Sequence, residues 1–272
     1  MADRPLAGRV ALVIGANHGI GAATAVALAQ RGADVAVTYL RVADDDDDPG
    51  RPVEYSAQRG QSADGTVASV EARGGRAHAI EADLTDPGAP ARLFDAAEAA
   101  LGPVSVLVHN ASGWRKDTLV PEIADRFGRR TEGISAATFD AQFHVDARAG
   151  ALLMAELAAR HRRRGADWGR IISLTSGGAM GFPGEVSYGA AKAALENYTM
   201  AASVELAADG ITANVVYPPV TDTGWVTDDV RRFVTESTDH VHVAAPEDVA
   251  EVIAWLCTDE ARLVTGNVVR LR

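Results

Sequence analysis

The sequence predicts one α/β domain in which a parallel sheet is covered by helices on both faces. Short apolar runs rich in Val and Ile alternate with longer alanine-rich segments of helical period, which is the pattern of repeated strand–helix units. The runs are apolar throughout, as VALVI at residues 10–14 illustrates, so both faces of the sheet must be buried. The length of 272 residues suits one large domain spanning residues 1–272.

Seven of these runs are predicted strands, and they fall at residues 10–14, 34–40, 76–82, 104–109, 170–175, 211–217 and 267–271. Two segments break the strand–helix rhythm and are predicted insertions, at residues 42–64 and 113–133. The first contains five consecutive Asp residues, Asp44 to Asp48, which favour a solvated loop. The second follows the carboxyl end of a strand, where it would be either a cover for the active site or a plain surface loop.

Composition excludes several classes of function. The net charge of -11 disfavours binding to nucleic acid phosphates, and no run reaches the roughly 18 apolar residues that cross a bilayer. The chain start lacks the apolar stretch of a signal peptide, which predicts a cytoplasmic protein. The single cysteine, Cys257, has no disulfide partner and lies in an apolar stretch typical of a buried helix. We therefore expect a small-molecule substrate, with no nucleic acid, membrane or metal partner.

A glycine-rich turn follows the first predicted strand and leads into a helix expected at residues 22–30. Strand, turn and helix start together present backbone N–H groups and a positive dipole end to an anion. Glycine is needed because a Cβ would hold a pyrophosphate away from the backbone. The pattern predicts a dinucleotide cofactor contacted by Gly15, Asn17, His18, Gly19, Ile20 and Gly21.

The end of the second strand carries no carboxylate that could bind a ribose 2′-OH. Its residues run Thr38, Tyr39, Leu40, Arg41, which favours NADP, with Arg41 and His18 near the 2′-phosphate and Tyr39 beside the cofactor. A lone Arg after a strand is also often only a solvated residue. NAD therefore stays an alternative.

Tyr188 and Lys192 lie four positions apart, hence on one face of a helix. A free tyrosine has a pKa near 10, and a fixed positive charge beside it lowers that value so that the phenol can exchange protons. Ser176, at the end of the strand at 170–175, could donate a hydrogen bond to a substrate carbonyl, although Ser there is commonly a turn or cap residue.

With these motifs in order, the chain resembles the short-chain dehydrogenase/reductase family along nearly its whole length. Gly15, Gly19 and Gly21 match its glycine motif, and Ser176, Tyr188 and Lys192 match its catalytic side chains. The resemblance implies further cofactor contacts at Asp83, Leu84, Asn110, Ala111, Pro218, Val220 and Thr223. It also implies a Rossmann fold with strand order 3-2-1-4-5-6-7, hydride transfer between NAD(P) and a ketone or secondary alcohol, and a homo-oligomer, either a tetramer or a dimer.

Two positions depart from the family pattern. Asp146 stands where the family often has an Asn that holds a water in a proton relay to the lysine, so it is either a relay member or a structural carboxylate. Pro219 replaces a Gly after the first Pro of its motif, which fixes φ and removes an N–H near the nicotinamide.

Four bulky apolar side chains are expected to line the substrate pocket and hint at a hydrophobic or polycyclic ketone: Trp114, Met180, Phe182 and Trp225. Core packing explains any one of them equally well. Two rival functions stay open. One is a 3-oxoacyl thioester (acyl carrier protein) reductase, and the other is a catalytically silent regulatory or scaffold protein that only binds the cofactor.

Overall fold

The computed structural model describes residues 4–42, 52–120, 124–125, 127–177 and 181–272. Its centre is a seven-stranded parallel sheet in the order β3-β2-β1-β4-β7-β8-β9. The strands are β1 (Val10–Ile14), β2 (Asp34–Tyr39), β3 (Ala77–Glu81), β4 (Val104–His109), β7 (Gly169–Leu174), β8 (Ile211–Tyr217) and β9 (Val268–Arg270). Counted among these seven strands alone, the order is 3-2-1-4-5-6-7, which confirms the predicted sheet.

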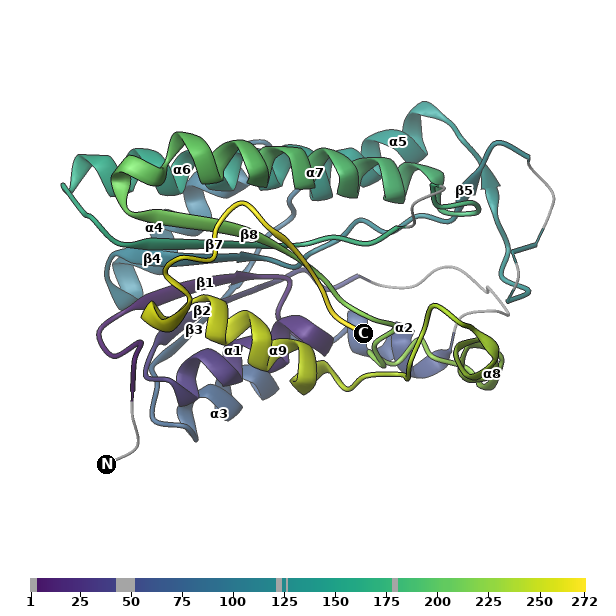
Figure 1. Cartoon of the computed structure of the whole chain (residues 1–272), viewed down its shortest axis with the longest axis horizontal. Helices are drawn as coiled ribbons and strands as arrows, with labels where there is room; N and C mark the ends of the chain where they lie inside the picture. The colour runs from purple at the N-terminus through teal and green to yellow at the C-terminus, as the bar shows by residue number, and fades with distance from the viewer. Residues whose placement is uncertain (1–3, 43–51, 121–123, 126, 178–180) are drawn as a thin grey trace.

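Helices cover both faces of this sheet (Figure 1). On one face lie α4 (Ala89–Leu101), α6 (Ala149–Arg163) and α7 (Val186–Glu205), and on the other α1 (Gly19–Gln30), α3 (Asp64–Glu71) and α9 (Pro246–Leu256). Two short 3-10 turns, η2 (Ala207–Asp209) and η3 (Asp259–Ala261), follow α7 and α9. Among the described residues, none of the helices combines the length and apolar character needed to cross a membrane.

Successive side chains of each strand pack into two separate hydrophobic layers, one on each face of the sheet. Val13 and Val37 pack with α1 and α9, whereas Leu12 and Ile14 pack with α4, α6 and α7. All four side chains are fully buried. Because successive side chains point to opposite faces, a strand must be apolar at every position when both faces are covered. Cys257, which follows α9, is buried as expected.

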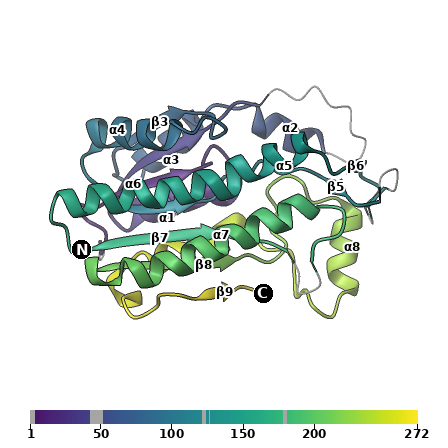
Figure 2. The same cartoon turned by 90° about the horizontal axis from the view of Figure 1, so that it is seen from above.

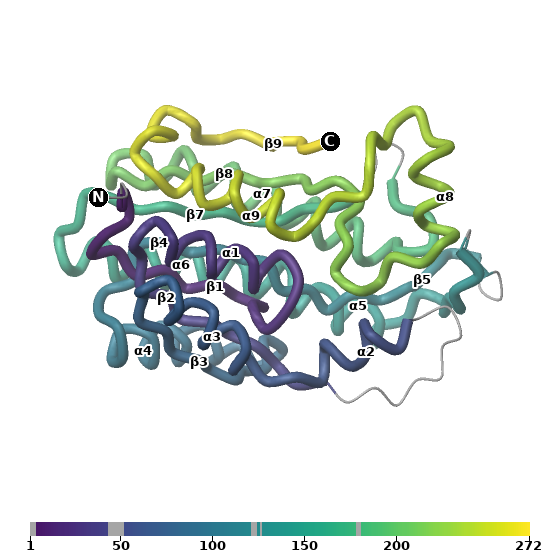
Figure 3. The backbone as a smooth tube through the Cα atoms, turned by 90° about the horizontal axis from the view of Figure 1, so that it is seen from below, coloured from purple at the N-terminus to yellow at the C-terminus, as the bar shows by residue number. Residues whose placement is uncertain are grey.

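The remaining elements gather beyond the carboxyl ends of the strands (Figures 2 and 3). They are α2 (Val53–Arg59), α5 (Ala136–Phe143), α8 (Asp228–Glu236) and a two-stranded parallel ladder of β5 (Asp117–Thr118) with β6 (Glu132–Gly133). Both insertions therefore contain regular structure. The expectation of a loop is wrong for α2, which Pro52 precedes and which has an acidic residue, Glu54, in its first turn. The run Asp44 to Asp48 lies outside the described residues.

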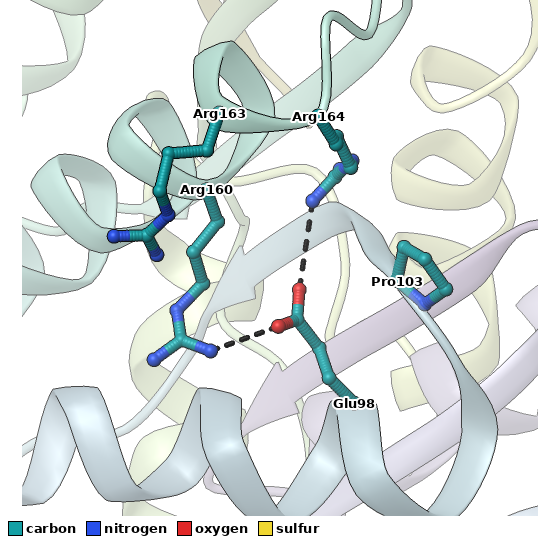
Figure 4. A pocket seen from close by; sticks show the side chains of 5 residues that line it. All are labelled: Glu98, Pro103, Arg160, Arg163 and Arg164. Carbon is teal, nitrogen blue, oxygen red and sulfur yellow. Dashed lines mark hydrogen bonds and ion pairs between the residues drawn. The ribbon is translucent and has the colours of Figure 1, made fainter.

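At the amino ends of the strands, arginines at the C-terminal end of α6 connect this helix to α4. Figure 4 shows the small pocket there, about 330 Å³, lined by Glu98, Pro103, Arg160, Arg163 and Arg164. Arg160 pairs with Glu98 at 2.8 Å and with Asp95 at 2.7 Å, and Arg164 donates to the carbonyl oxygen of Val104 at 2.5 Å. These pairs join two helices, so the basic run ending α6 has a structural role.

Candidate active site

The glycine turn leaves no room for side chains. A Cβ on Gly21 would lie 2.0 Å from the carbonyl oxygen of Gly15, and one on Gly15 would lie 2.7 Å from the Cα of Ala111. Gly15 also has a φ of 74°, a conformation that favours glycine. Asn110 donates to the Gly15 carbonyl at 2.5 Å, so the turn after β4 supports the turn after β1. The geometry brings the predicted cofactor residues of both turns together.

The first turn of α1 is not capped by a side chain. His18 is the N-cap residue but makes no side-chain bond to the helix, and Ile20 follows in the first turn. The backbone N–H groups there remain available to an anion. Thr223 lies against the turn, because a Cβ on Gly19 would come within 2.9 Å of its side chain. A pyrophosphate therefore fits this position chemically, with Gly19 small enough to admit it.

The segment after β8 is held beside the turn by backbone bonds. The amide of Ala244 donates to the Val220 carbonyl at 2.9 Å, and the amide of Asp222 donates back to Ala244 at 2.9 Å. Pro218 and Pro219, which begin the segment, restrict φ. The predicted rigid backbone is placed next to the cofactor turn.

Around the ends of β2 and β3, the residues predicted to contact the cofactor have partners that the sequence did not reveal. Arg41 forms a bidentate pair with Glu81 at the end of β3, with Nη2 2.7 Å and Nε 3.0 Å from the carboxylate oxygens. Tyr39 is half-buried against the core. Leu84 is buried, while the exposed Asp83 accepts a hydrogen bond from the amide of Thr85 at 2.8 Å.

Tyr188 and Lys192 face the interior together from the first half of α7. Tyr188 shares a hydrogen bond with Ser176, which follows β7. The ammonium nitrogen of Lys192 lies 5.7 Å from the Tyr188 ring centroid and 2.8 Å from Oδ1 of Asp146. Lys192 and Asp146 are both almost fully buried. The four predicted catalytic residues thus form one cluster at the carboxyl edge of the sheet.

The position of Asp146 depends on a π-helical turn, His144–Arg148, between α5 and α6. Such turns often occur at functional sites. Oδ2 of Asp146 accepts from Gln142 Nε2 at 2.5 Å and from the amide of Gly113 at 2.9 Å. Its carbonyl oxygen contacts Nε2 of the buried His109 at 3.1 Å, and burial lowers the pKa of that imidazole to about 4. Asp146 therefore links Lys192 to the second insertion.

The surroundings of Tyr188 favour its protonated form. Burial raises the pKa of its phenol far above the usual value, and the negative charge of Asp146 raises the pKa further. The hydrogen bond with Ser176 acts in the opposite direction. The spacing of Lys192 and Tyr188 predicted that the ammonium lowers this pKa, but in the structure the ammonium is paired with Asp146. A protonated phenol is the form that donates a proton to a substrate oxygen.

Of the aromatic side chains predicted to line a substrate pocket, Phe182 packs beside Tyr188, while Trp114 and Trp225 lie on other segments. The ring of Phe182 lies 5.7 Å from that of Tyr188, and Trp114 contacts Tyr55 of α2 edge-on at 5.8 Å. Trp225 donates from Nε1 to the carbonyl of Thr221 at 3.0 Å. Met180 lies outside the described residues. Tyr55 was missed because the neighbouring Asp run made its segment look like a solvated loop.

The second insertion is attached to the start of α7, which favours the active-site cover over the plain surface loop. Arg129 pairs with Glu185, the N-cap residue of α7, at 2.7 Å, and its guanidinium lies 5.4 Å from the Trp114 ring centroid. The fully buried Asp117 accepts from the amide of Ser187 at 2.8 Å and from its hydroxyl at 2.5 Å. The residue next to Tyr188 is therefore fixed by a carboxylate from the insertion.

Replacing Asp117 by Asn should loosen the start of α7. An amide oxygen accepts less strongly than a carboxylate, and one of the two buried donors of Ser187 loses its partner, so we expect unfolding to become easier by about 1–3 kcal/mol. The rate of any proton transfer by Tyr188 should fall more than cofactor affinity. Urea unfolding and cofactor titration measure the two effects. Asp140→Asn, at an exposed carboxylate on α5, is the control, and equal behaviour of both variants would refute the anchoring role.

Comparisons with known proteins agree with this architecture. A family model described as enoyl-(acyl carrier protein) reductase matches residues 15–271. The chain is 35% identical over 264 residues to cis-4-hydroxycyclohexanecarboxylate dehydrogenase of Sinomonas cyclohexanicum, covering 96% of this chain and 93% of that protein. It is 30% identical over 281 residues to versicolorin reductase of Emericella nidulans, covering 97% and 94%. A crystal structure of an angucycline C-6 ketoreductase with bound NADP matches with a TM-score of 0.78 at 30% identity, covering 98% of this chain and 95% of that one.

Proposed function

Because the chain belongs to the short-chain dehydrogenase/reductase family, we propose that it is an NADP(H)-preferring oxidoreductase that interconverts a ketone and a secondary alcohol. The observation that carries this proposal is the cluster of the half-buried Ser176 and Tyr188 with the buried Lys192, at the carboxyl ends of the strands, where the uncapped start of α1 also lies. A scaffold protein that only binds the cofactor would not need a phenol hydrogen-bonded to a serine beside a buried lysine.

The residues present fit a nicotinamide dinucleotide. Gly15 and Gly19 allow close approach of a pyrophosphate to the backbone, and Lys192 has donors that suit ribose hydroxyls. Thr223 and Val220 follow β8 and would border the nicotinamide. When bound, the nicotinamide supplies or takes the hydride.

The chain's own residues then handle the oxygen. The Ser176 hydroxyl donates a hydrogen bond to the carbonyl oxygen and stabilises its developing negative charge. Tyr188 gives that oxygen its proton, and burial keeps the phenol protonated until then. Asp146 orients the Lys192 ammonium and connects it to Gln142 and Ser112, which is a polar path for returning the proton.

The substrate of this reaction is a hydrophobic or polycyclic ketone. Trp114, Tyr55 and Phe182 present flat apolar faces near Tyr188. Two of the similar proteins are named versicolorin reductase and angucycline C-6 ketoreductase. Aromatic rings stack on fused-ring ligands, and each such contact contributes about 0.5–1.5 kcal/mol.

The test uses purified protein, NADPH carrying deuterium at both C4 positions of the nicotinamide, and three carbonyl substrates. α-Tetralone represents a fused-ring ketone, cyclohexanone a small ketone, and acetoacetyl-N-acetylcysteamine a 3-oxoacyl thioester. We expect deuterium on the carbinol carbon of the tetralone product and the highest kcat/KM for α-tetralone. A preference for the thioester would assign the acyl-carrier reductase alternative, and no transfer to any of the three would refute the proposed function.

Tyr55→Ala should weaken binding of the fused-ring ketone selectively. Removing one stacked ring raises KM for α-tetralone about three- to tenfold, whereas KM for cyclohexanone stays nearly unchanged. Steady-state kinetics with saturating NADPH measure both values. Tyr198→Ala, at an exposed tyrosine of α7, is the matched control, and a parallel rise for both ketones in Tyr55→Ala would argue against a substrate wall.

Asp146→Asn should move the pH dependence of alcohol oxidation toward lower pH. Oxidation requires the Tyr188 phenolate, and the Asp146 charge raises the pKa of that phenol. Without the charge the pKa falls, so the phenolate forms at lower pH and kcat on the acidic limb rises by roughly threefold to tenfold. A pH–kcat profile measures the change, and a profile that superposes on the wild type would remove Asp146 from the proton chemistry.

A further inference from the structure

A buried histidine at the end of β4 contacts the main chain of the π turn. His109 is fully buried, and its Nε2 lies 3.1 Å from the carbonyl oxygen of Asp146. The carbonyl of Val145 also forms a hydrogen bond with this ring. A carbonyl oxygen only accepts, so Nε2 carries the ring proton. The ring therefore acts on the π turn as a hydrogen-bond donor.

The ring of His109 contributes this donor without changing its own charge. Burial, followed by the positive charge of Lys192, lowers the pKa of the imidazole to about 4, and the carboxylate of Asp146 raises this pKa by a smaller effect. At neutral pH and above, the ring is therefore uncharged. Any part that His109 plays in the chemistry of Tyr188 must come from the position of its N–H group.

The segment that begins at His109 contacts Asp146 at a second point. Four residues further on, the amide of Gly113 donates to Oδ2 of Asp146 at 2.9 Å. The segment after β4 thus holds both the main chain and the side chain of Asp146, and Oδ1 faces the Lys192 ammonium at 2.8 Å. Contacts at two points fix the direction of a side chain, whereas one contact leaves it free to rotate.

The first turn of α6 leaves room for the imidazole ring. A Cβ on Gly150 would lie 3.1 Å from Cδ2 and 3.3 Å from Nε2 of His109. It would also lie 2.5 Å from Cδ1 of Leu195, which belongs to α7. The glycine therefore lets the ring fit between the two helices, next to the turn that precedes α6.

We propose that His109 is a positioning residue of the active site, whose bond to the Asp146 carbonyl holds the π turn in the register that directs the Asp146 carboxylate at Lys192. The inference rests on the proposed function. In the π turn, the amide of Ala149 donates to the carbonyl of His144, five residues earlier, so the regular four-residue pattern is broken. A buried carbonyl without a partner is costly, so loss of the donor should change the turn and move the carboxylate.

The first experiment measures the ion pair of Asp146 and Lys192 by unfolding the full chain, without cofactor or substrate. Lys192→Met is made in the wild type, in His109→Leu and in His109→Gln, and urea unfolding gives each equilibrium constant. Lys192→Met should raise the unfolding constant of the wild type at least about tenfold more than that of His109→Leu, where the carboxylate no longer faces the lysine. His109→Gln keeps an N–H donor and should respond like the wild type.

The second experiment records the pH dependence of kcat for oxidation of α-tetralol with NADP. The charge of Asp146 raises the pKa of Tyr188, and Glu185 and Tyr55 raise this pKa by smaller effects. Because His109→Leu displaces the Asp146 charge, the acidic limb should move to lower pH by about half a unit to one unit. Adding Asp146→Asn to His109→Leu should move the limb no further, because both changes act through the same carboxylate.

His161 provides a matched control for both experiments. It is also fully buried, and its Nε2 lies 2.8 Å from the carbonyl oxygen of Asp209, near the C-terminal end of α6. His161→Leu should lower the stability of the protein through the loss of one buried hydrogen bond. The response to Lys192→Met and the pH profile should both remain those of the wild type.

Each other outcome overturns the inference. Equal responses to Lys192→Met in the wild type and in His109→Leu would make His109 a packing residue, and so would a His109→Gln protein that behaves like His109→Leu. A pH shift that persists beside Asp146→Asn would mean that His109 acts through another group. If His109→Leu does not fold, His109→Met, which fills the space without a donor, replaces it. A wild type that neither oxidises nor reduces any substrate refutes the proposed function, whereas the unfolding experiment still decides the role of His109.

Discussion

Replacing Tyr188 by Phe should lower kcat for ketone reduction by about 100- to 10,000-fold and leave the dissociation constant for NADPH within about twofold of wild type. The substitution removes one oxygen from a half-buried ring and keeps the ring's packing against Phe182. Only the proton donor and its hydrogen bond with Ser176 are lost. Single-turnover kinetics with α-tetralone and a fluorescence titration with NADPH separate the two quantities.

Tyr198 provides the control for this experiment. It lies on the same helix as Tyr188 but its side chain is 46% exposed, so Tyr198→Phe should have wild-type kinetics. Activity retained in Tyr188→Phe would remove the phenol from the mechanism. Loss of cofactor binding together with activity would instead show that the substitution damaged the fold of the site.

Lys192→Met should destabilise the protein by about 3–5 kcal/mol, because it leaves the buried Asp146 carboxylate without its cation. Turnover should fall as well, since the variant lacks the ammonium that lies beside the Tyr188 ring and belongs to the polar path for the proton. Urea unfolding monitored by tryptophan fluorescence gives the free energy of unfolding. An unchanged dependence of this free energy on urea concentration would show that the variant and the wild type unfold in the same transition.

Adding Asp146→Asn to Lys192→Met completes a double-mutant cycle. The second substitution removes the uncompensated charge, so the double variant should recover most of the lost stability while remaining a poor catalyst. Stability changes that simply add would show that the two groups are independent, which would contradict the buried ion pair. Recovery of turnover would mean that Lys192 acts only by neutralising Asp146.

Local patterns were sufficient to predict the sheet and the centre of the site. Continuous apolar runs, whose side chains alternate between two covered faces, predict the strands, and the four-residue spacing of Tyr188 and Lys192 places them on one face of α7. The glycine turn follows from its place between β1 and α1. Each of these features is encoded within a few consecutive residues.

The missed features depend on partners far apart in the sequence. Asp117 and Ser187 are separated by 70 positions, and Arg41 and Glu81 by 40, so no short-range sequence pattern predicts either pair. The Glu81 carboxylate neutralises the charge for which Arg41 was predicted to bind the 2′-phosphate, although the end of the strand was correctly predicted. Tyr55 was hidden for a different reason, because the charge of the adjacent Asp run outweighed the helix signals of Pro52 and Glu54.

The direction in which the Asp146 side chain points depends on the π turn at His144–Arg148, because the turn sets the register of the main chain there. Such a turn amounts to one surplus residue accommodated within a continuous helix. Excising a residue there would rotate the preceding segment by roughly 100° relative to α6, because each helical residue advances by that angle. Grafting this carboxylate–lysine pair onto another scaffold would consequently require transplanting the wide turn, since a point substitution on a regular helix would direct the acid elsewhere.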